Sequence, residues 1–246
     1  MGVCKNFARI RSFHTCSSLL RETAKNLKGK KHSSQQWLVR QLRDPYVEKA
    51  KQENYRCRSA FKLLEMNERF DILKPGMRVV DCGAAPGSWT QVAVRLTNSH
   101  GKNWDEKKRG TVVAIDRLPI HPIEGAIVLG NLNFTSDEAQ RILLETLNGK
   151  LVDLVLSDMA PNATGTRSMD HENIIDLAYA AMKFALTISR VNGAFVTKVW
   201  DGGMSQRLEE DIGRFYNSVK IVRPGATRDE SSEKFILARG FKGLKT

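Results

Sequence analysis

Short apolar runs alternate with amphipathic stretches over most of the chain, and this alternation limits the possible folds more than any other feature. The runs are rich in valine, isoleucine and leucine, and most are apolar on both faces of a strand. Such strands are typical of a parallel sheet that is covered by helices on both sides. We expect strands at residues 77–82, 111–116, 126–129, 152–157, 193–199, 219–222 and 234–238.

The stretches between these strands carry helix-start signals. Asp44 followed by Pro45 predicts a helix start, because aspartate caps helices and proline suits the first turn. The segment Thr135-Ser-Asp-Glu138 has the spacing of a capping box with threonine as the cap. Asp170 is expected to cap a long helix. One helix is expected to begin at residue 45. The others are expected over residues 59–70, 89–96, 135–147, 170–190 and 205–215.

These elements predict an α/β fold with a Rossmann-like, mostly parallel sheet of seven strands and helices on both faces. The last two strands, joined by a loop around residues 224–232, are expected to form an antiparallel edge. We expect one folded domain over residues 36–246, because a domain of this size buries a core without disulfides or metals.

The formal net charge of +12 favours a polyanionic partner, but the charge is unevenly placed. Residues 1–43 hold most of it, and the acids and bases of the remainder nearly balance. Residues 1–35 are rich in arginine and serine and poor in acids, which is typical of a mitochondrial targeting segment followed by a linker. The expected location is therefore the mitochondrial matrix. A basic arm that binds RNA directly is the alternative.

Metal and membrane functions have no support in the sequence. The four cysteines, Cys4, Cys16, Cys57 and Cys82, form no CxxC pair, and the histidines lack ligand spacing. We therefore expect no metal. The sequence has no apolar run long enough to predict a transmembrane helix.

Polar side chains follow the first three expected strands, where an open α/β sheet binds its ligand. Asp81 precedes a glycine-rich turn, and its carboxylate could accept hydrogen bonds from a cationic amine. Asp116 is placed for ribose hydroxyls, and Asn133 for an adenine edge. An adenosine with an amino-acid tail suits this pattern, so S-adenosylmethionine is a better candidate cofactor than NAD.

Five segments, in order, resemble the FtsJ-type ribose 2′-O-methyltransferases, a family of S-adenosylmethionine-dependent enzymes. They are YRCRSAFKLLE at 55–65, DCGAAPGSWTQV at 81–92, LVLSDMAPNATG at 154–165, GAFVTKVW at 193–200 and SSEKFILA at 231–238. The resemblance covers about residues 40–242, and several motifs at family spacing are far more specific than one.

The resemblance implies a catalytic tetrad of Lys62, Asp158, Lys198 and Glu233. Asn133 stands where the family usually has aspartate, and its side-chain oxygen could still accept from an adenine amino group. The expected cofactor site comprises Asp81, Gly83, Ala84, Ala85, Pro86, Gly87, Ser88, Trp89, Asp116, Asn133 and Asp158.

The tetrad also suits the chemistry of methylating a ribose hydroxyl, which must lose its proton as the new bond forms. Lys198 is the candidate for the base, or for a group that only orients the hydroxyl. Lys62 could supply the second cation that makes a lysine a better base, whereas the charges of Asp158 and Glu233 oppose that effect. The sequence leaves the choice open.

With the targeting segment, the resemblance implies methylation of a uridine in mitochondrial large-subunit ribosomal RNA, in support of ribosome biogenesis. The expected partner is this RNA, in the large subunit or its precursor, and the expected enzyme is a monomer. A ribosome-assembly or RNA-binding factor with little catalytic need is the main alternative, and a small-molecule methyltransferase is another.

Candidate RNA contacts lie on both sides of the predicted tetrad. Aromatic candidates for base stacking are Trp37, Tyr55 and Trp200, of which the first two could equally be packing residues. Basic candidates are Arg40, Arg43, Lys49, Lys51, Arg56, Arg58, Arg223, Arg228 and Lys234.

Overall fold

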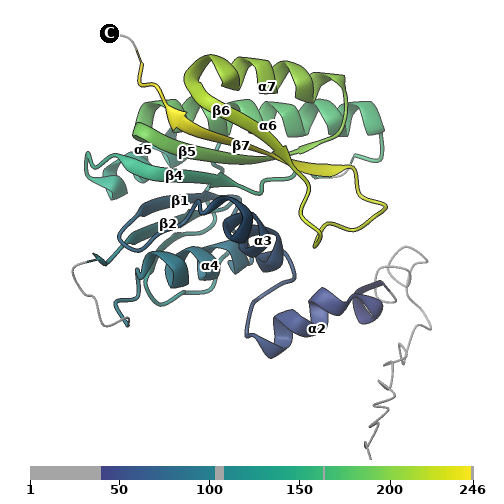
Figure 1. Cartoon of the computed structure of the whole chain (residues 1–246), viewed down its shortest axis with the longest axis horizontal. Helices are drawn as coiled ribbons and strands as arrows, with labels where there is room; N and C mark the ends of the chain where they lie inside the picture. Colours follow the sequence, from purple (N-terminus) through teal and green to yellow (C-terminus); the bar gives the residue numbers. More distant parts are fainter. Residues whose placement is uncertain (1–39, 103–107, 163, 245–246) are drawn as a thin grey trace, which may run out of the picture. The chain divides into compact units, whose positions relative to one another are not determined.

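The computed structural model of the protein describes residues 40–102, 108–162 and 164–244. The chain divides into two units at Pro45, and all the strands in the described residues belong to the second unit, residues 46–246 (Figure 1). Its elements are α2 (Pro45–Gln52), α3 (Ala60–Phe70), β1 (Arg78–Cys82), α4 (Ser88–Thr97), β2 (Thr111–Ile115), β3 (Ala126–Leu129), α5 (Asp137–Leu147), β4 (Val152–Ser157), α6 (Arg167–Ile188), β5 (Ser189–Trp200), α7 (Gly203–Phe215), β6 (Tyr216–Val222) and β7 (Glu233–Phe241).

The seven strands form one sheet in the order β3-β2-β1-β4-β5-β7-β6. Strands β1 to β5 are parallel to one another, and β7 runs antiparallel to both β5 and β6. The predicted α/β class, the mostly parallel sheet and its antiparallel edge are confirmed. The chain order reverses between β1 and β4, which places a topological switch point there.

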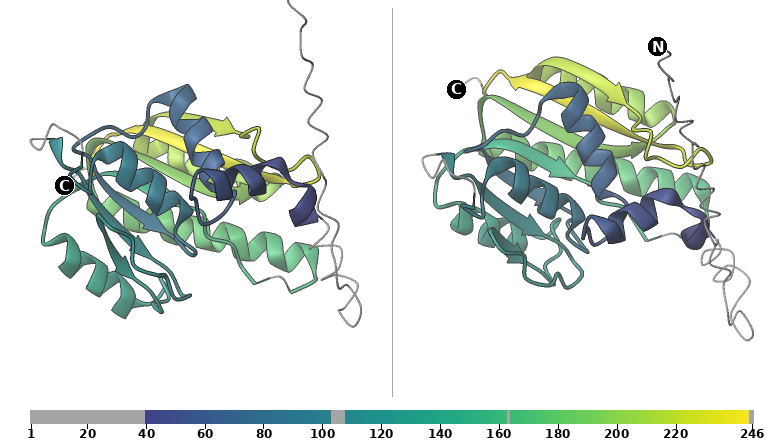
Figure 2. Two further views of the ribbon diagram at one scale, coloured as in Figure 1. Left: turned by 90° about the horizontal axis from the view of Figure 1, so that it is seen from below. Right: turned by 60° about the horizontal axis from the view of Figure 1, so that its bottom comes forward.

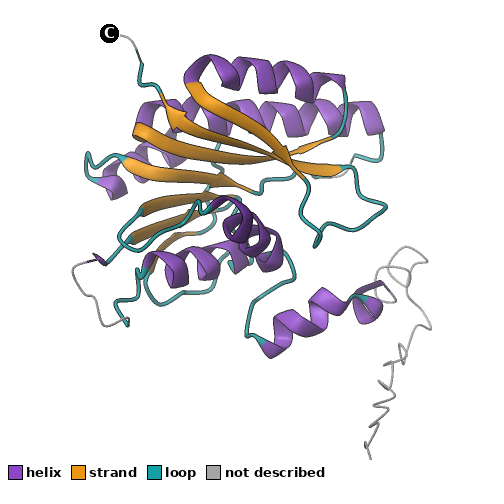
Figure 3. Cartoon of the chain, viewed as in Figure 1, coloured by secondary structure: helices purple, strands orange, loops and turns teal. Residues whose placement is uncertain are grey.

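Helices cover both faces of the sheet, as predicted (Figures 2 and 3). Buried side chains of α5, α6 and α7 pack on one face, and those of α3 and α4 pack on the other. Central strands β1 and β4 are buried almost throughout, which explains why their sequences are apolar without alternation. Burying each large aliphatic side chain contributes about 1.5–3 kcal/mol to stability.

The expected start of the long helix at Asp170 is wrong. Helix α6 begins at Arg167, with Thr166 at the N-cap position. The Asp170 carboxylate instead accepts hydrogen bonds from the Thr164 backbone N–H and hydroxyl, at 2.8 and 2.7 Å. It therefore closes the loop before the helix, as an acid in the first turn often does.

Strand β5 begins earlier than predicted, directly after α6 ends. The register with β4 shifts between Val152 and Leu154, so the extra residues form an irregular start to the strand. Asn192 has φ of 66° there, a left-handed conformation that asparagine tolerates. Strands β6 and β7 and helix α7 also extend a few residues beyond their predicted bounds.

The cap of α5 is Ser136, not Thr135 as the capping-box spacing predicted. The Ser136 hydroxyl accepts a hydrogen bond from the Ala139 N–H at 3.2 Å. Thr135 instead donates from its own hydroxyl to the Asn133 side chain. The Thr135 side chain therefore stabilises the turn before the helix and does not cap the helix.

Replacing Ser136 with alanine should lower the free energy of unfolding by about 1 kcal/mol, because an orphan N–H at the helix start loses its acceptor. Urea denaturation measures the change. Thr166→Ala is the matched control, since Thr166 occupies an N-cap position without a side-chain capping bond. Equal losses for the two variants would contradict the assignment of Ser136 as a cap.

Candidate active site at the carboxyl edge of the sheet

A cavity of about 740 Å³ opens at the carboxyl ends of β1, β2 and β4, beside the switch point. Residues that follow these strands line it, together with one side of α6. Five members of the expected cofactor site are among the lining residues: Gly83, Ala85, Asp116, Asn133 and Asp158. The cavity therefore lies where the strand-end pattern of the sequence predicted a ligand.

The glycine-rich turn after β1 needs glycine at two positions. Gly83 has φ of 76°, and a Cβ there would meet the backbone of Met159 at 2.8 Å. Gly87 has φ of 114°, and a Cβ there would lie 2.7 Å from an Arg56 guanidinium nitrogen. Left-handed backbone and close approach together exclude larger residues. The turn thus brings the β1 and β4 loops together at the rim of the cavity.

Asp116 connects two loops at the cavity wall. One carboxylate oxygen accepts from the Ala85 N–H at 2.9 Å, and the other accepts from the Leu118 N–H at 2.7 Å. Each carboxylate oxygen has a second lone pair, so both could still accept from ligand hydroxyls. The side chain therefore has the placement and the free acceptor capacity that ribose binding requires.

Asn133 presents a different group from the one expected. Its side-chain oxygen already accepts from the Thr135 N–H at 3.3 Å and the Thr135 hydroxyl at 3.0 Å. Because a backbone N–H can only donate, this contact fixes which end of the amide is the oxygen. The amide nitrogen is left for a ligand in the cavity, so Asn133 offers a donor where an acceptor was expected.

Asp81 is completely buried beneath the turn and does not line the cavity. One of its oxygens accepts from the Thr90 hydroxyl at 2.6 Å, and the other has no hydrogen-bond partner in the described ranges. Burial raises the pKa of Asp81 to about 7; the Thr90 hydrogen bond opposes this shift, and the charges of Asp158 and Asp116 add to it.

The remaining turn residues shape the loop without lining the cavity. Ala84 and Ser88 are buried, Pro86 is exposed, and the Ser88 hydroxyl lies 3.0 Å from the Cys57 sulfur. Trp89 is buried against Phe235 and donates its indole N–H to a backbone carbonyl of the segment before α3.

The four residues of the expected tetrad form two ion pairs. The Lys198 ammonium lies 3.1 Å from a carboxylate oxygen of Asp158 and donates to the Asp158 carbonyl at 2.6 Å. The Lys62 ammonium lies 2.5 Å from a carboxylate oxygen of Glu233. Both lysines are at least nine-tenths buried, which is rare for lysine and requires such partners.

Four different elements bring these side chains to one edge of the sheet. Asp158 follows β4, and Lys198 lies near the end of the neighbouring strand β5. Glu233 begins β7, which runs in the opposite direction and so starts at the same edge. Lys62 comes from the first turn of α3. The arrangement joins residues that are far apart in the sequence.

Asp158 is held in its charged form by its neighbours. Burial by itself would raise its pKa, but the ammonium groups of Lys198 and Lys62 and a hydrogen bond from Ser59 outweigh this effect. The pKa of Asp158 is therefore lower than usual, and the carboxylate is ionised at neutral pH. The charged form is the one that holds the Lys198 ammonium.

A model of the FtsJ-like methyltransferase family matches residues 55–241, which include the cavity loops and both ion pairs. The chain belongs to the FtsJ-like methyltransferase family. The mitochondrial rRNA methyltransferase 2 of Drosophila melanogaster is 53% identical over 223 residues, 91% of this chain and 89% of the relative. Ribosomal RNA large subunit methyltransferase E of Cereibacter sphaeroides is 46% identical over 224 residues, 91% of each chain.

A solved structure from Plasmodium falciparum, assigned as a ribosomal RNA methyltransferase, has the same fold. The TM-score is 0.67 at 24% sequence identity, and the match covers 77% of this chain and 100% of that one.

Several candidate RNA contacts of this FtsJ-like chain have structural partners instead. Arg56 donates to the carbonyls of Pro86, His121 and Pro122, at 2.8 to 2.9 Å, and so ties the cofactor loop to its neighbour. Tyr55 is buried against Phe61, which confirms the packing alternative for this residue.

The other basic candidates for RNA contact differ in their exposure and in their partners. Lys51 is exposed, Lys49 lies over the ring of Phe61, and Arg58 donates to the Ala226 carbonyl at 2.6 Å. Arg223 donates to the carbonyls of residues 228 and 229, and Lys234 pairs with Asp201 at 2.7 Å.

The remaining candidates for RNA contact are Trp200 and the residues of the N-terminal segment. Trp200 is half-buried and packs edge-on against His171. Arg40 and Arg43 belong to the N-terminal unit, whereas Trp37 and the predicted targeting segment lie outside the described residues.

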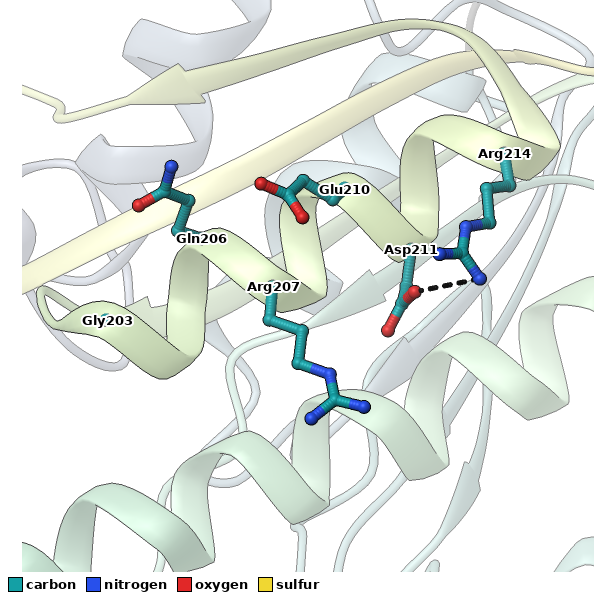
Figure 4. Close-up of a pocket in the computed structure, with 6 residues that line it drawn as sticks. All are labelled: Gly203, Gln206, Arg207, Glu210, Asp211 and Arg214. Carbon is teal, nitrogen blue, oxygen red and sulfur yellow. Dashed lines mark ion pairs between the residues drawn. The ribbon is translucent and has the colours of Figure 1, made fainter.

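A second hollow lies along the outer side of α7 and contains none of the expected site residues (Figure 4). Its charges are mixed: Glu210 and Asp211 lie between Arg207 and Arg214 along the helix, and Asp211 pairs with Arg214 at 3.3 Å. Over the described ranges, no group of three or more potential metal ligands is found, and no helix is long and apolar enough to cross a bilayer.

The sequence analysis missed Ser59, which holds a tetrad carboxylate. Its hydroxyl donates to Asp158 at 2.8 Å, and its carbonyl accepts from the Trp89 indole at 2.8 Å. Ser59 occupies the N-cap position of α3 but makes no capping bond, because its backbone is already helical there. Serine before a helix is normally interpreted as a cap, so the sequence carried no signal for this role.

Replacing Ser59 with alanine should lower kcat for methyl transfer about tenfold, since a hydrogen bond to a charged group contributes about 1.5–3 kcal/mol. KM should change little, and Ser59→Thr should restore most of the rate. Ser205→Ala is the control, because this buried serine donates only to the Gly202 carbonyl. A change confined to KM, or equal losses in both alanine variants, would show that Ser59 has no positioning role.

Proposed function

We propose that the protein uses S-adenosylmethionine to methylate the ribose 2′-hydroxyl of a uridine in mitochondrial large-subunit ribosomal RNA, in support of ribosome biogenesis. The observation that carries this proposal is the pair of buried lysine–carboxylate contacts, one of which includes Asp158 of the cavity wall. These contacts involve all four residues that the family resemblance assigned to catalysis, Lys62, Asp158, Lys198 and Glu233.

The cavity fits S-adenosylmethionine in the kind and placement of its polar groups. Asp116 offers carboxylate oxygens for ribose hydroxyls, and Asn133 offers an amide N–H for a ring nitrogen of adenine. Gly83 allows a ligand to approach the backbone closely. The unpartnered oxygen of Asp81 leaves a buried acceptor under the same loop, near where a cationic amine would be stabilised.

Bound S-adenosylmethionine would supply an electrophilic methyl group on its sulfonium. The protein must then orient the ribose hydroxyl and accept or pass on its proton. The Lys198 ammonium donates to the Asp158 carbonyl and forms an ion pair with the Asp158 carboxylate, which leaves at least one N–H of Lys198 to donate to the hydroxyl oxygen. In this resting arrangement Lys198 orients the hydroxyl, and it can act as the base only after losing a proton.

The names of the relatives support ribosomal RNA as the substrate. The Drosophila protein is named as a mitochondrial rRNA methyltransferase, and the Cereibacter protein as a large-subunit rRNA methyltransferase. Both matches cover about nine-tenths of this chain. The choice of uridine and of the 2′-oxygen comes from the family resemblance of the sequence motifs.

We also propose that residues 1–35 direct the chain to the mitochondrial matrix and that residues 36–246 form the methyltransferase domain. The arginine-rich, acid-poor composition of the first segment supports this division. The mitochondrial name of the Drosophila relative is consistent with it.

Asp116→Asn should weaken binding of S-adenosylhomocysteine by about ten- to a hundredfold, because charge-assisted hydrogen bonds contribute about 1.5–3 kcal/mol. Isothermal titration calorimetry measures the change. Asp176→Asn is the matched control, since Asp176 is an aspartate on the α6 side of the same cavity. An unchanged affinity in Asp116→Asn would exclude Asp116 from the cofactor site.

Lys198→Ala should abolish methyl transfer and leave binding of S-adenosylhomocysteine largely intact, because Lys198 faces the acceptor hydroxyl in the proposed arrangement. The assay offers labelled S-adenosylmethionine and large-subunit ribosomal RNA, free or in immature particles, and maps the label by its resistance to alkaline cleavage. Lys183→Ala, which replaces an exposed lysine of helix α6, is the control for loss of a positive charge.

Near-normal turnover in Lys198→Ala would contradict the assignment of this lysine. Label on a base would contradict ribose methylation. Particle binding by the wild-type protein without any methylation would favour the assembly-factor alternative.

A further inference from the structure

Three cations surround Phe70 at the end of α3, and we call this group of Arg69, Phe70, Lys220 and Arg239 the Phe70 cluster. The three charged groups lie 5.2, 5.6 and 6.0 Å from the centre of the Phe70 ring. Arg239 also donates to the Phe70 carbonyl at 3.3 Å. Such distances allow cation–π attraction, which holds the cations together on one ring.

The positive charge of the Phe70 cluster is not neutralised by ion pairs. Arg69 and Lys220 are exposed, Arg239 is half-buried, and none of them pairs with an acid anywhere in the described ranges. The next residue after Phe70, Asp71, is paired with Lys74 at 2.9 Å. Even with the adjacent Glu68 counted, the cluster keeps a net positive charge that a polyanion would complement.

The Phe70 cluster lies on the same face of the sheet as the tetrad. Along β7, Arg239 follows Phe235 by an even number of residues and so shares its face, and Phe235 is opposite Lys198 in the register. On β6, Lys220 is opposite Leu237, which is also on that face. The cluster therefore lies on that face at the far end of β7 from Glu233, and the buried side chains of Phe235 and Leu237 lie between it and the tetrad.

Helix α3 carries one residue of the tetrad, Lys62, and one residue of the cluster, Phe70. Near its start Lys62 pairs with Glu233 at the first residue of β7, and at its end the Phe70 carbonyl accepts from Arg239 near the other end of the same strand. Eight residues of helix correspond to about 12 Å. An RNA strand with its target ribose at the tetrad would reach the Phe70 cluster within a few nucleotides.

We propose that the Phe70 cluster binds the phosphate backbone of the RNA substrate beside the target nucleotide, which rests on the proposed function. Arg69 and Lys220 contact phosphates, and Arg239, anchored on the Phe70 carbonyl, adds a fixed positive charge between them. Contacts of this kind position an RNA without reading its sequence.

The test is Arg69→Gln combined with Lys220→Gln, two exposed positions where glutamine should not disturb folding. Binding to a transcript of large-subunit ribosomal RNA is measured by filter binding over a series of salt concentrations. Affinity should fall about five- to tenfold, and the slope of log affinity against log salt should become shallower by about 1.4, since each phosphate contact contributes about 0.7.

The matched control is Lys183→Gln combined with Arg207→Gln, which removes the same charge from the helices on the other face of the sheet. The control should keep the wild-type slope, and both variants should keep wild-type affinity for S-adenosylhomocysteine. Equal losses in the two double variants, or no loss in either, would overturn the proposal.

Charge reversal provides a second measurement. Arg69→Glu combined with Lys220→Glu should weaken RNA binding further than the glutamine pair, and an identical effect would contradict phosphate contact. If the RNA is bound but its ribose is never methylated, the proposed reaction fails, while a changed salt slope still supports the binding surface.

Discussion

The buried carboxylate of Asp158 is the interaction on which the rest of the site depends. A charge in this position is costly unless partners surround it, and Asp158 has three: Lys198, Ser59 and the nearby charge of Lys62. These partners come from β5, from the segment before α3 and from α3 itself. Satisfying one charge therefore fixes the positions of three elements, and the geometry of the candidate site follows from that requirement.

The direction of β7 has a functional consequence as well. A parallel strand in its place would begin at the opposite edge of the sheet, far from the carboxyl ends of β1 and β4. Because β7 is antiparallel to β5, its first residue, Glu233, lies at the edge where Asp158 and Lys198 are found. The antiparallel insertion thus completes the set of four side chains, and its partner Lys62 is supplied by the helix that lies along it.

Most of the fold could be predicted because apolar runs that alternate with amphipathic helices are typical of a parallel sheet covered on both faces. The errors lie at the ends of helices and strands. The Thr135 hydroxyl donates to Asn133 and does not cap α5, Asp170 closes the loop before α6, and the start of β5 includes a register shift. At each helix end several polar residues lie close together in the sequence, and the cap pattern alone does not show which of them bonds to which.

Less of the candidate site than of the fold could be predicted from local sequence pattern. Local pattern placed Asp116 and Asn133 at strand ends, but the tetrad was recognised only from the family motifs, since an isolated lysine is usually a solvated surface residue. Sequence could not show that Arg56 is held by three carbonyls, because those carbonyls belong to two other loops. The basic charge of a segment therefore predicted RNA contact where the folded chain uses the side chain structurally.

Asp81, buried beneath the glycine-rich turn, makes the stability of the fold depend on pH. Its pKa of about 7 in the folded state lies above the value of about 3.9 expected in the unfolded chain. Between these two values the folded protein holds a proton that the unfolded chain has released, so the contribution of Asp81 to stability falls as pH rises through this range. Above pH 7 the fold contains a buried, half-partnered carboxylate under the glycine turn. Such a group destabilises the fold by itself, and a cationic ligand bound close to it would stabilise its charged form.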